Sequence, residues 1–425
     1  MNRCAFLAII ALSWIVSCAP TPTAQPRMEI VTRVVTPTSQ VIVVTATPGP
    51  QEIQPASTPT PQAIQLSPSD ISKIKEGIQP TLALYAQAYN QNDPDLLTKA
   101  VDQTNLPFRR FVRTRFDTYQ KSFLGGQLKF SYAVQDVKLR DFGFVQARIR
   151  ISGDGEAAWF FRQVDGTWVV SEPTSEQLGE PNITEHVFFT FYTWSWADDV
   201  NNRVIQLVEN ARERVRKKLG KVPDQQATVK IKPIYGLTPF DDPFAVAYYG
   251  SARSSAELDR IEIFAPHSYG FGSYDAMGGW EKELQDILTH EYTHMTHKRS
   301  FDNAGNLMSW VTEGLAEYVS DELRTYQVRA AVQSGNIIPI VDTSSRVYKQ
   351  DLMHLELLER DRSLAFGFSV SLVVYITQNY GGLEGFWKFV HAYDDKQDID
   401  AALRQAFGIG FDQFDRDWRA WLKKY

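Results

Sequence analysis

Hydrophobic residues recur three and four positions apart in two stretches of the second half of the chain. This spacing is typical of helices that bury one apolar face. The positions are Trp280, Leu284, Ile287 and Leu288 in the first stretch, and Met308, Val311, Leu315, Tyr318 and Val319 in the second. The pattern therefore predicts two helices, one running through residues 280–294 and one through residues 308–319.

A different pattern fills residues 69–180. A helix is predicted from Ser69, because Ser69 and Asp70 can cap its first turn and apolar residues follow at helical spacing. Apolar or alternating stretches, separated by turns that contain glycine, then predict strands. These strands are residues 128–139, 145–151, 157–164 and 167–170. The sheet is expected to be an antiparallel meander, so this region is predicted to be a separate α+β domain.

Residues 181–425 mix the two patterns. Residues 186–196 are strongly aromatic and are expected to include a strand, and residues 197–219 carry apolar positions at helical spacing. Residues 227–235 and 260–265 are further predicted strands. With the two helices described first, they predict a mainly helical domain with a short mixed sheet. The fold class expected for the whole chain is therefore α+β.

The beginning of the chain lacks the pattern of a folded domain. Arg3 precedes an apolar run over residues 5–16, which is too short to cross a bilayer comfortably and is typical of a secretory signal. From Ala19 the composition changes abruptly to Thr, Pro, Gln, Ser and Val. Such a tract cannot form a core. Residues 18–68 are therefore predicted to be a disordered tether of about fifty residues.

The tetrapeptide Ile15-Val16-Ser17-Cys18 resembles a bacterial lipobox. The resemblance implies that residues 1–17 are a lipoprotein signal peptide and that the thiol of Cys18 carries a lipid. An ordinary secretory signal with a spare cysteine is the alternative. Several acyl chains on one residue give lasting attachment. The protein is therefore expected at the cell membrane, lipid-anchored on the extracytoplasmic face.

Composition and charge exclude one class of partner. The chain has 425 residues, a formal net charge of -6 and 22% charged residues. It has no basic stripe of the kind that nucleic-acid binding requires, so no nucleic-acid partner is expected. The only cysteines are Cys4 and Cys18. Because Cys4 would leave with the signal peptide, the mature protein is expected to have no disulfide.

The candidate chemistry lies on the two helices described first. His290, Glu291 and His294 form the motif H-E-x-x-H, and Glu313 follows after eighteen residues. Positions i and i+4 lie on the same helix face, so the two imidazoles can hold one metal ion between them. Glu313 would complete a set of two histidines and one glutamate. Glu291 would lie beside the open coordination position, where a carboxylate can take a proton from water that the metal has made more acidic.

The arrangement H-E-x-x-H, eighteen residues and then E-G-x-A-E-Y resembles the gluzincin metallopeptidases. Residues 369–382 and 400–421 resemble the C-terminal helices of bacterial peptidase-MA-like proteins, so that the resemblance covers about residues 182–425. It implies a thermolysin-like domain that binds one Zn²⁺ ion and hydrolyses a peptide or protein substrate. In such sites a peptide adds as an extra strand to the sheet edge before the first zinc helix. Here that edge strand would be residues 260–265, and residues 263–266 would line the cleft.

The resemblance also assigns roles to individual residues. The implied zinc ligands are His290, His294 and Glu313, and the implied general base is Glu291. Glu317 resembles the acid that orients a ligating imidazole by accepting its other N–H. A solvated carboxylate on the helix surface is the alternative for Glu317.

One position departs from the peptidase-MA-like pattern. In such families a Tyr or His stabilises the oxyanion of the tetrahedral intermediate, and a Tyr commonly lies three residues before the serine that corresponds to Ser369. This chain has Phe366 there, which cannot donate a hydrogen bond. The candidates to replace it are Tyr348, His354 and Tyr375, although Tyr375 also reads as a core aromatic residue.

The remaining histidines are expected to be structural. His297 follows His294 by three residues, but Glu313 is better placed as the third ligand, so His297 is predicted to be solvated. His186, His267 and His391 have no neighbours at ligand spacing.

In the first predicted domain, residues 159–168 (W-F-F-R-Q-V-D-G-T-W) resemble the end of the cone-shaped helix-and-curved-sheet fold of the nuclear transport factor and cystatin-like superfamily. A packing or binding module is expected there.

Two main functions are consistent with these patterns, beside a weaker third in which the metal site hydrolyses a bond other than a peptide bond. The first is a membrane-tethered extracytoplasmic zinc peptidase composed of an accessory domain, residues 69–180, and a gluzincin domain, residues 181–425. The second is a non-catalytic zinc-containing lipoprotein that binds a peptide or an envelope component. The intact Glu291 favours the enzyme, and Phe366 favours the binding protein.

Overall fold

The computed structural model describes residues 66–122, 129–152, 155–234, 246–251, 258–264, 279–300, 307–341 and 362–425. The predicted signal peptide, Cys18 and nearly all of the predicted tether lie outside these residues. The described residues form helices and two sheets, which confirms the α+β class. None of the helices in these ranges is both long enough and apolar enough to cross a bilayer.

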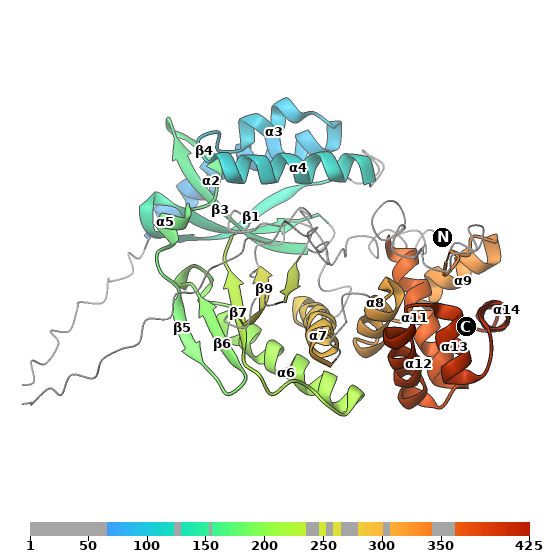
Figure 1. Ribbon diagram of the computed structural model, residues 1–425. Coiled ribbons are helices and arrows are strands. Elements are labelled where there is room, and N and C mark those ends of the chain that lie inside the picture. Colours follow the sequence, from blue (N-terminus) through green and yellow to red (C-terminus); the bar gives the residue numbers. More distant parts are fainter. Residues whose placement is uncertain are drawn as a thin grey trace, which may run out of the picture.

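The first unit consists of three helices and a four-stranded sheet, drawn in blue to green in Figure 1. Its elements are α2 Pro68–Gln91, α3 Pro94–Ala100, α4 Leu106–Ser122, β1 Tyr132–Leu139, β2 Val145–Ile151, β3 Gly155–Val164 and β4 Thr167–Val170. The strands follow one another in the order β1-β2-β3-β4, and every pair is antiparallel. The meander predicted from the sequence is therefore confirmed. The first helix begins slightly earlier than predicted, because Ser67 rather than Ser69 caps it and Pro68 occupies its first turn.

The second unit contains a five-stranded sheet in the order β5-β6-β7-β9-β8. Its strands are β5 Asn182–Glu185, β6 Phe189–Thr193, β7 Ala227–Lys232, β8 Ala247–Gly250 and β9 Asp259–Phe264. The three central strands, β6, β7 and β9, run parallel, and β5 and β8 pair antiparallel to their neighbours. The predicted mixed sheet is thus present.

The prediction that residues 260–265 form a sheet edge is wrong. Residues 260–264 belong to β9, which pairs with β7 on one side and with β8 on the other, and residue 265 lies outside the described residues. The edge is β8, a four-residue strand that was not predicted. Its segment, Ala247-Tyr248-Tyr249-Gly250, is too short to show a period, and only its two tyrosines favour a strand.

Helices α6 Asn201–Leu219 and α7 Gly279–Ser300 cover one face of this sheet (Figure 1). Apolar residues of β6, β7 and β9, among them Phe191, Val229 and Ile263, form one core with both helices. The first unit adjoins the second beyond the C-terminal ends of β6 and β7. There Phe144 and Phe160 pack with Trp196, Leu178 and Ile234 in a small apolar cluster.

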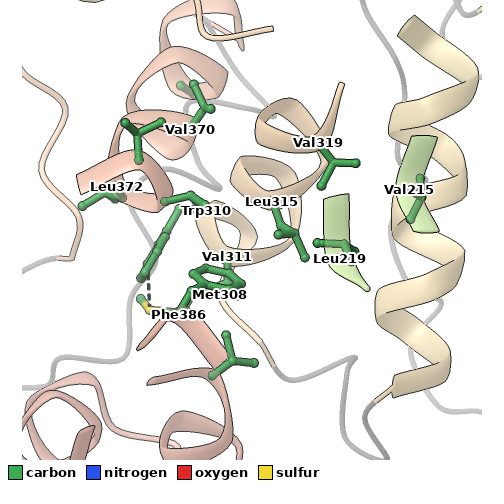
Figure 2. Close-up of a cluster of buried hydrophobic side chains, with 14 of the residues drawn as sticks. Val215, Leu219, Met308, Trp310, Val311, Leu315, Val319, Val370, Leu372 and Phe386 are labelled. Atoms are coloured by element: carbon green, nitrogen blue, oxygen red, sulfur yellow. Dashed lines mark hydrogen bonds between the residues drawn. The ribbon is translucent and has the colours of Figure 1, made fainter. Parts of the chain in front are cut away.

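The described residues from 307 onward are mainly helical and extend the same core. The helices are α8 Ser309–Val319, α9 Thr325–Ser334, α11 Arg362–Asn379, α12 Gly382–Lys396, α13 Ile399–Phe407 and α14 Phe411–Leu422. Helix α8 lies among α6, α11 and α12, as Figure 2 shows around Trp310, Leu315 and Phe386. The indole N–H of Trp310 donates to Sδ of Met308 at 3.3 Å.

Candidate metal centre

Helix α7 is buried on all sides where it carries the H-E-x-x-H motif. Every residue from 287 to 297 is buried, so the prediction of a helix with a single apolar face is wrong for this part. Its buried hydroxyls are satisfied within the helix itself, since Thr289, Thr293 and Thr296 each donate to the carbonyl four residues earlier. A helix with many polar residues can therefore occupy the interior between the sheet and α8.

The structure brings His290 and His294 of α7 together with Glu313 of α8. The two Nε2 atoms lie 3.0 Å apart. Oε2 of Glu313 lies 3.3 Å from Nε2 of each histidine. All three side chains are buried, and one ligand atom from each lies within 4.8 Å of the others, so that this group could hold a metal ion.

The charges of this group also fit a cation. Glu313, Glu317 and Glu291 are all buried close to the two histidines. Burial disfavours ionisation of Glu313, but His294 and His290 outweigh it and hold the pKa of Glu313 below its usual value. Burial likewise works against the charged form of His290, but hydrogen bonds to Glu313 and Glu317 raise its pKa to about 10. The two carboxylates thus stabilise positive charge at His290, as they would stabilise a bound cation.

Glu291 lies next to this group and is tied to the sheet edge. Its Oε2 accepts a hydrogen bond of 2.8 Å from the backbone N–H of Tyr249 on β8. Its Oε1 is buried and has no hydrogen-bond partner among the described residues. Burial raises the pKa of Glu291, while His290 and His294 oppose that rise. Such a carboxylate is suited to taking up a proton.

Glu317 is buried one turn beyond Glu313 and faces the other side of His290. Its Oε1 lies 3.3 Å from Nδ1 of His290. Arg324 binds both of its oxygens, with Nε 2.5 Å from Oε2 and Nη2 3.1 Å from Oε1. Burial works against the charge of Glu317, but Arg324 and His290 lower its pKa. Glu317 is therefore not a solvated carboxylate on the helix surface.

Phe366 packs against the same histidine. Its ring centroid lies 6.1 Å from that of His290 in an edge-on arrangement. Of the residues considered as its replacement, Tyr375 is buried among Tyr380, Phe414 and Trp421, which makes it a core residue. The other two, Tyr348 and His354, lie outside the described residues.

The prediction that His297 is solvated is wrong. Its side chain is buried because the whole middle of α7 is enclosed, and burial lowers its pKa to about 3. His186 lies at the turn between β5 and β6, where its Nδ1 is 2.6 Å from Glu209. His391 is exposed on α12 and His267 lies outside the described residues.

Two residues that contact this centre were not anticipated from the sequence. The first is Tyr249, whose strand carries only a weak signal. The second is Arg324, which lies seven residues beyond Glu317 and shows no motif. Its contact depends on the turn that joins α8 to α9, so no sequence pattern could have identified it.

A scan of protein-family models finds no match to this chain, and neither does a search of the curated proteins. Its function must therefore be argued from the site itself.

One buried carboxyl group on α7 lies outside this centre. Both oxygens of Glu283 are buried without a hydrogen-bond partner among the described residues. Burial and the nearby Glu322 raise its pKa from 4.5 to about 9. Because the folded-state pKa is the higher one, the stability of the protein should be unaffected below about pH 4 and fall as the pH rises toward 9.

Replacing Glu283 by Gln should therefore raise the free energy of unfolding increasingly between pH 5 and pH 8, by up to about 1.4 kcal/mol for each pH unit, and have little effect near pH 5. Urea denaturation at the two pH values measures this difference. Glu281→Gln is the matched control, since Glu281 is half-exposed on the same helix and should show no such pH dependence. An equal effect of Glu283→Gln at both pH values would contradict the explanation.

Proposed function

We propose that this protein is a membrane-tethered, extracytoplasmic, zinc-dependent peptidase. The observation that carries the proposal is the convergence of a buried ligand group, His290, His294 and Glu313, with a buried carboxylate, Glu291, beside it. Two histidines and one carboxylate are three protein ligands. They leave a fourth coordination position for water or substrate, as is usual in catalytic rather than structural zinc sites.

The spacing of the three ligand atoms supports zinc as the metal. Ligands placed tetrahedrally at the usual zinc distances of about 2.0–2.1 Å lie about 3.3 Å from one another. The corresponding distances here are 3.0 Å between the two histidine nitrogens and 3.3 Å from each of them to Glu313. Nitrogen and carboxylate donors in this number also suit zinc better than calcium or magnesium, which prefer sets of oxygen ligands.

When bound, zinc supplies Lewis acidity, which polarises a carbonyl group and makes water easier to deprotonate near neutral pH. Glu291 accepts the proton of the attacking water and later delivers it to the departing amine nitrogen. The hydrogen bond from Tyr249 to Oε2 fixes this carboxylate and leaves Oε1 to exchange the proton. Glu317 accepts the Nδ1–H of His290, so that Nε2 presents its lone pair to the metal.

The edge strand β8 is the proposed docking site for the substrate. The N–H of Tyr249 donates to Glu291, so the outer side of β8 faces the general base. A peptide that pairs with β8 as an additional strand would pass beside Glu291. Strand β8 takes the place of the strand predicted at residues 260–265, because β9, Asp259–Phe264, lies inside the sheet.

The remaining parts of the proposal rest on sequence. Cys18 would carry the lipid anchor, residues 18–68 would hold the folded part away from the membrane, and residues 69–180 would form an accessory domain of the cone-like type.

A second function is supported by Phe366. Where a Tyr would stabilise the oxyanion, this ring packs against His290 and can donate no hydrogen bond. The alternative is therefore a non-catalytic zinc-containing lipoprotein that binds a peptide or an envelope component.

A peptide-library digest separates the two functions. The purified protein is assayed as isolated, after removal of metal with a chelator, and after restoration of zinc, and products are identified by mass spectrometry. We expect cleavage in the first and third samples and none in the second, because the reaction depends on the metal. Bound zinc without cleavage of any peptide would support the binding protein. Failure to bind zinc would contradict both functions.

A further inference from the structure

Arg324 contacts several side chains beside the metal centre. It directly precedes α9 and its side chain is only 12% exposed. Two of its nitrogens bind the two oxygens of Glu317 in a forked arrangement, and the same carboxylate reaches Nδ1 of His290 at 3.3 Å. A planar guanidinium matches a carboxylate in this way, whereas an ammonium group cannot.

The guanidinium is itself held from other directions. Its third nitrogen, Nη1, lies 3.4 Å from Oγ of Ser363. Its central carbon lies 5.2 Å from the centroid of the Phe366 ring, the ring that also packs edge-on against His290. Phe366 therefore contacts both ends of the series Arg324, Glu317 and His290. These two contacts account for an aromatic ring at that position.

The backbone of Arg324 has an uncommon conformation. Its φ and ψ angles of 46° and 31° lie in the left-handed region, which side chains other than Gly, Asn and Asp seldom adopt. Such conformations persist where the surrounding structure enforces them, and they concentrate at functional sites. Gly367 of α11 packs closely against α9, since a Cβ there would lie 2.9 Å from a methyl group of Val328, whereas its distance of 3.5 Å from Cβ of Arg324 would be an ordinary contact.

We propose that Arg324 is a positioning residue for the metal centre, which fixes the orientation of His290 through Glu317 and thereby sets the affinity for the metal. The inference rests on the metal site of the proposed function but not on hydrolysis. A carboxylate on a helix can rotate about its side-chain bonds. Because the guanidinium of Arg324 binds both of its oxygens, Glu317 cannot rotate and keeps one oxygen near Nδ1 of His290. The imidazole ring of His290 then keeps Nε2 directed at Glu313 and His294.

The test measures zinc affinity by competition with a chromophoric chelator. Arg324→Gln in the full-length protein should weaken zinc binding by about tenfold or more, the usual effect of losing an outer partner of a ligand. Arg324→Lys keeps the positive charge but cannot make the two parallel hydrogen bonds to Glu317. Its zinc affinity should therefore lie between those of Arg324→Gln and the wild type. The matched control is Arg329→Gln on α9, because Arg329 binds the carbonyl of Tyr425 and does not contact the centre. It should bind zinc as the wild type does.

A double-mutant cycle shows whether Arg324 acts through Glu317. Glu317→Gln should also weaken zinc binding, and the double variant should lose little more than Glu317→Gln alone, because the two residues act in series. The visible spectrum of the cobalt-substituted protein should change in the same variants, which reports the ligand geometry without any assay of activity. Circular dichroism of the metal-free forms verifies folding, and Arg324→Lys carries the test if Arg324→Gln does not fold.

Wild-type affinity and an unchanged cobalt spectrum in both Arg324 variants would overturn the inference, and so would additive losses in the cycle. A wild-type protein that binds zinc but cleaves no peptide would contradict the peptidase function alone. The effect of Arg324 on affinity would still be measured in that case, so the two failures are distinguishable.

Discussion

Replacing Glu291 by Gln is expected to lower the rate of peptide hydrolysis by about 10²–10⁴-fold, the usual contribution of a general acid–base group. The amide cannot take the proton of the attacking water. It can still accept the hydrogen bond from Tyr249, so the position of the side chain and the contact with β8 should be preserved. Zinc content should remain that of the wild type, because Glu291 is not one of the three grouped ligands.

Steady-state rates on a peptide identified in the library digest measure this effect. Glu281→Gln serves as the control, since Glu281 lies on the same helix, half-exposed and paired with Arg203, and should leave the rate unchanged. If Glu291→Gln binds zinc and cleaves the peptide at the wild-type rate, Glu291 is not the base.

Replacing Gly314 by Ala is expected to destabilise the protein by about 3 kcal/mol, which is at the upper end for overpacking. In an ordinary helix the same change is stabilising by about 1 kcal/mol. Here a Cβ would lie 2.4 Å from the carbonyl oxygen of Ser369 and 2.7 Å from its carbonyl carbon. Both atoms belong to the backbone of α11 and cannot rotate away, so α8 and α11 would have to separate.

Denaturation of the metal-free protein measures this loss of stability. Zinc affinity should fall as well, because Gly314 adjoins Glu313. Gly367→Ala is the comparison, since the first atom that its Cβ would meet is a methyl group of Val328, which belongs to a side chain. It should cost less. A Gly314→Ala variant more stable than the wild type would show that α8 and α11 are not packed as closely as described.

Much of the fold could be predicted because its elements have strong local patterns. Strands β3 and β4 are separated by a turn at Asp165-Gly166, as the sequence predicts, and three of the four strands match the predicted ranges closely. The edge strand β8 could not be predicted, since four residues cannot display a period. The sequence pattern also did not predict that α7 is buried on all sides. A pattern of polar and apolar residues assigns threonines to the solvent-exposed face. Here the threonines are buried, because their hydroxyls donate to carbonyl groups of the same helix.

The candidate site divides in a similar way. The three possible ligands could be identified because the spacing between His290 and His294 is fixed by the helix and Glu313 lies in a motif. Glu317 follows from the same motif. The contacts of Tyr249 and Arg324 depend on how β8 and the start of α9 lie against the two helices. Such contacts join segments that are not related by a fixed spacing in the sequence, so no motif predicts them.

The proposed zinc site consists of His290, His294 and Glu313, which together would hold one ion. Elemental analysis of the purified protein after dialysis against limiting zinc is its decisive test, with wild type beside Glu313→Gln. We expect one zinc per chain in the wild type and a large loss in the variant, because Glu313 is the proposed carboxylate ligand. A wild-type protein without zinc, or a variant that retains it fully, would show that these residues do not hold the metal.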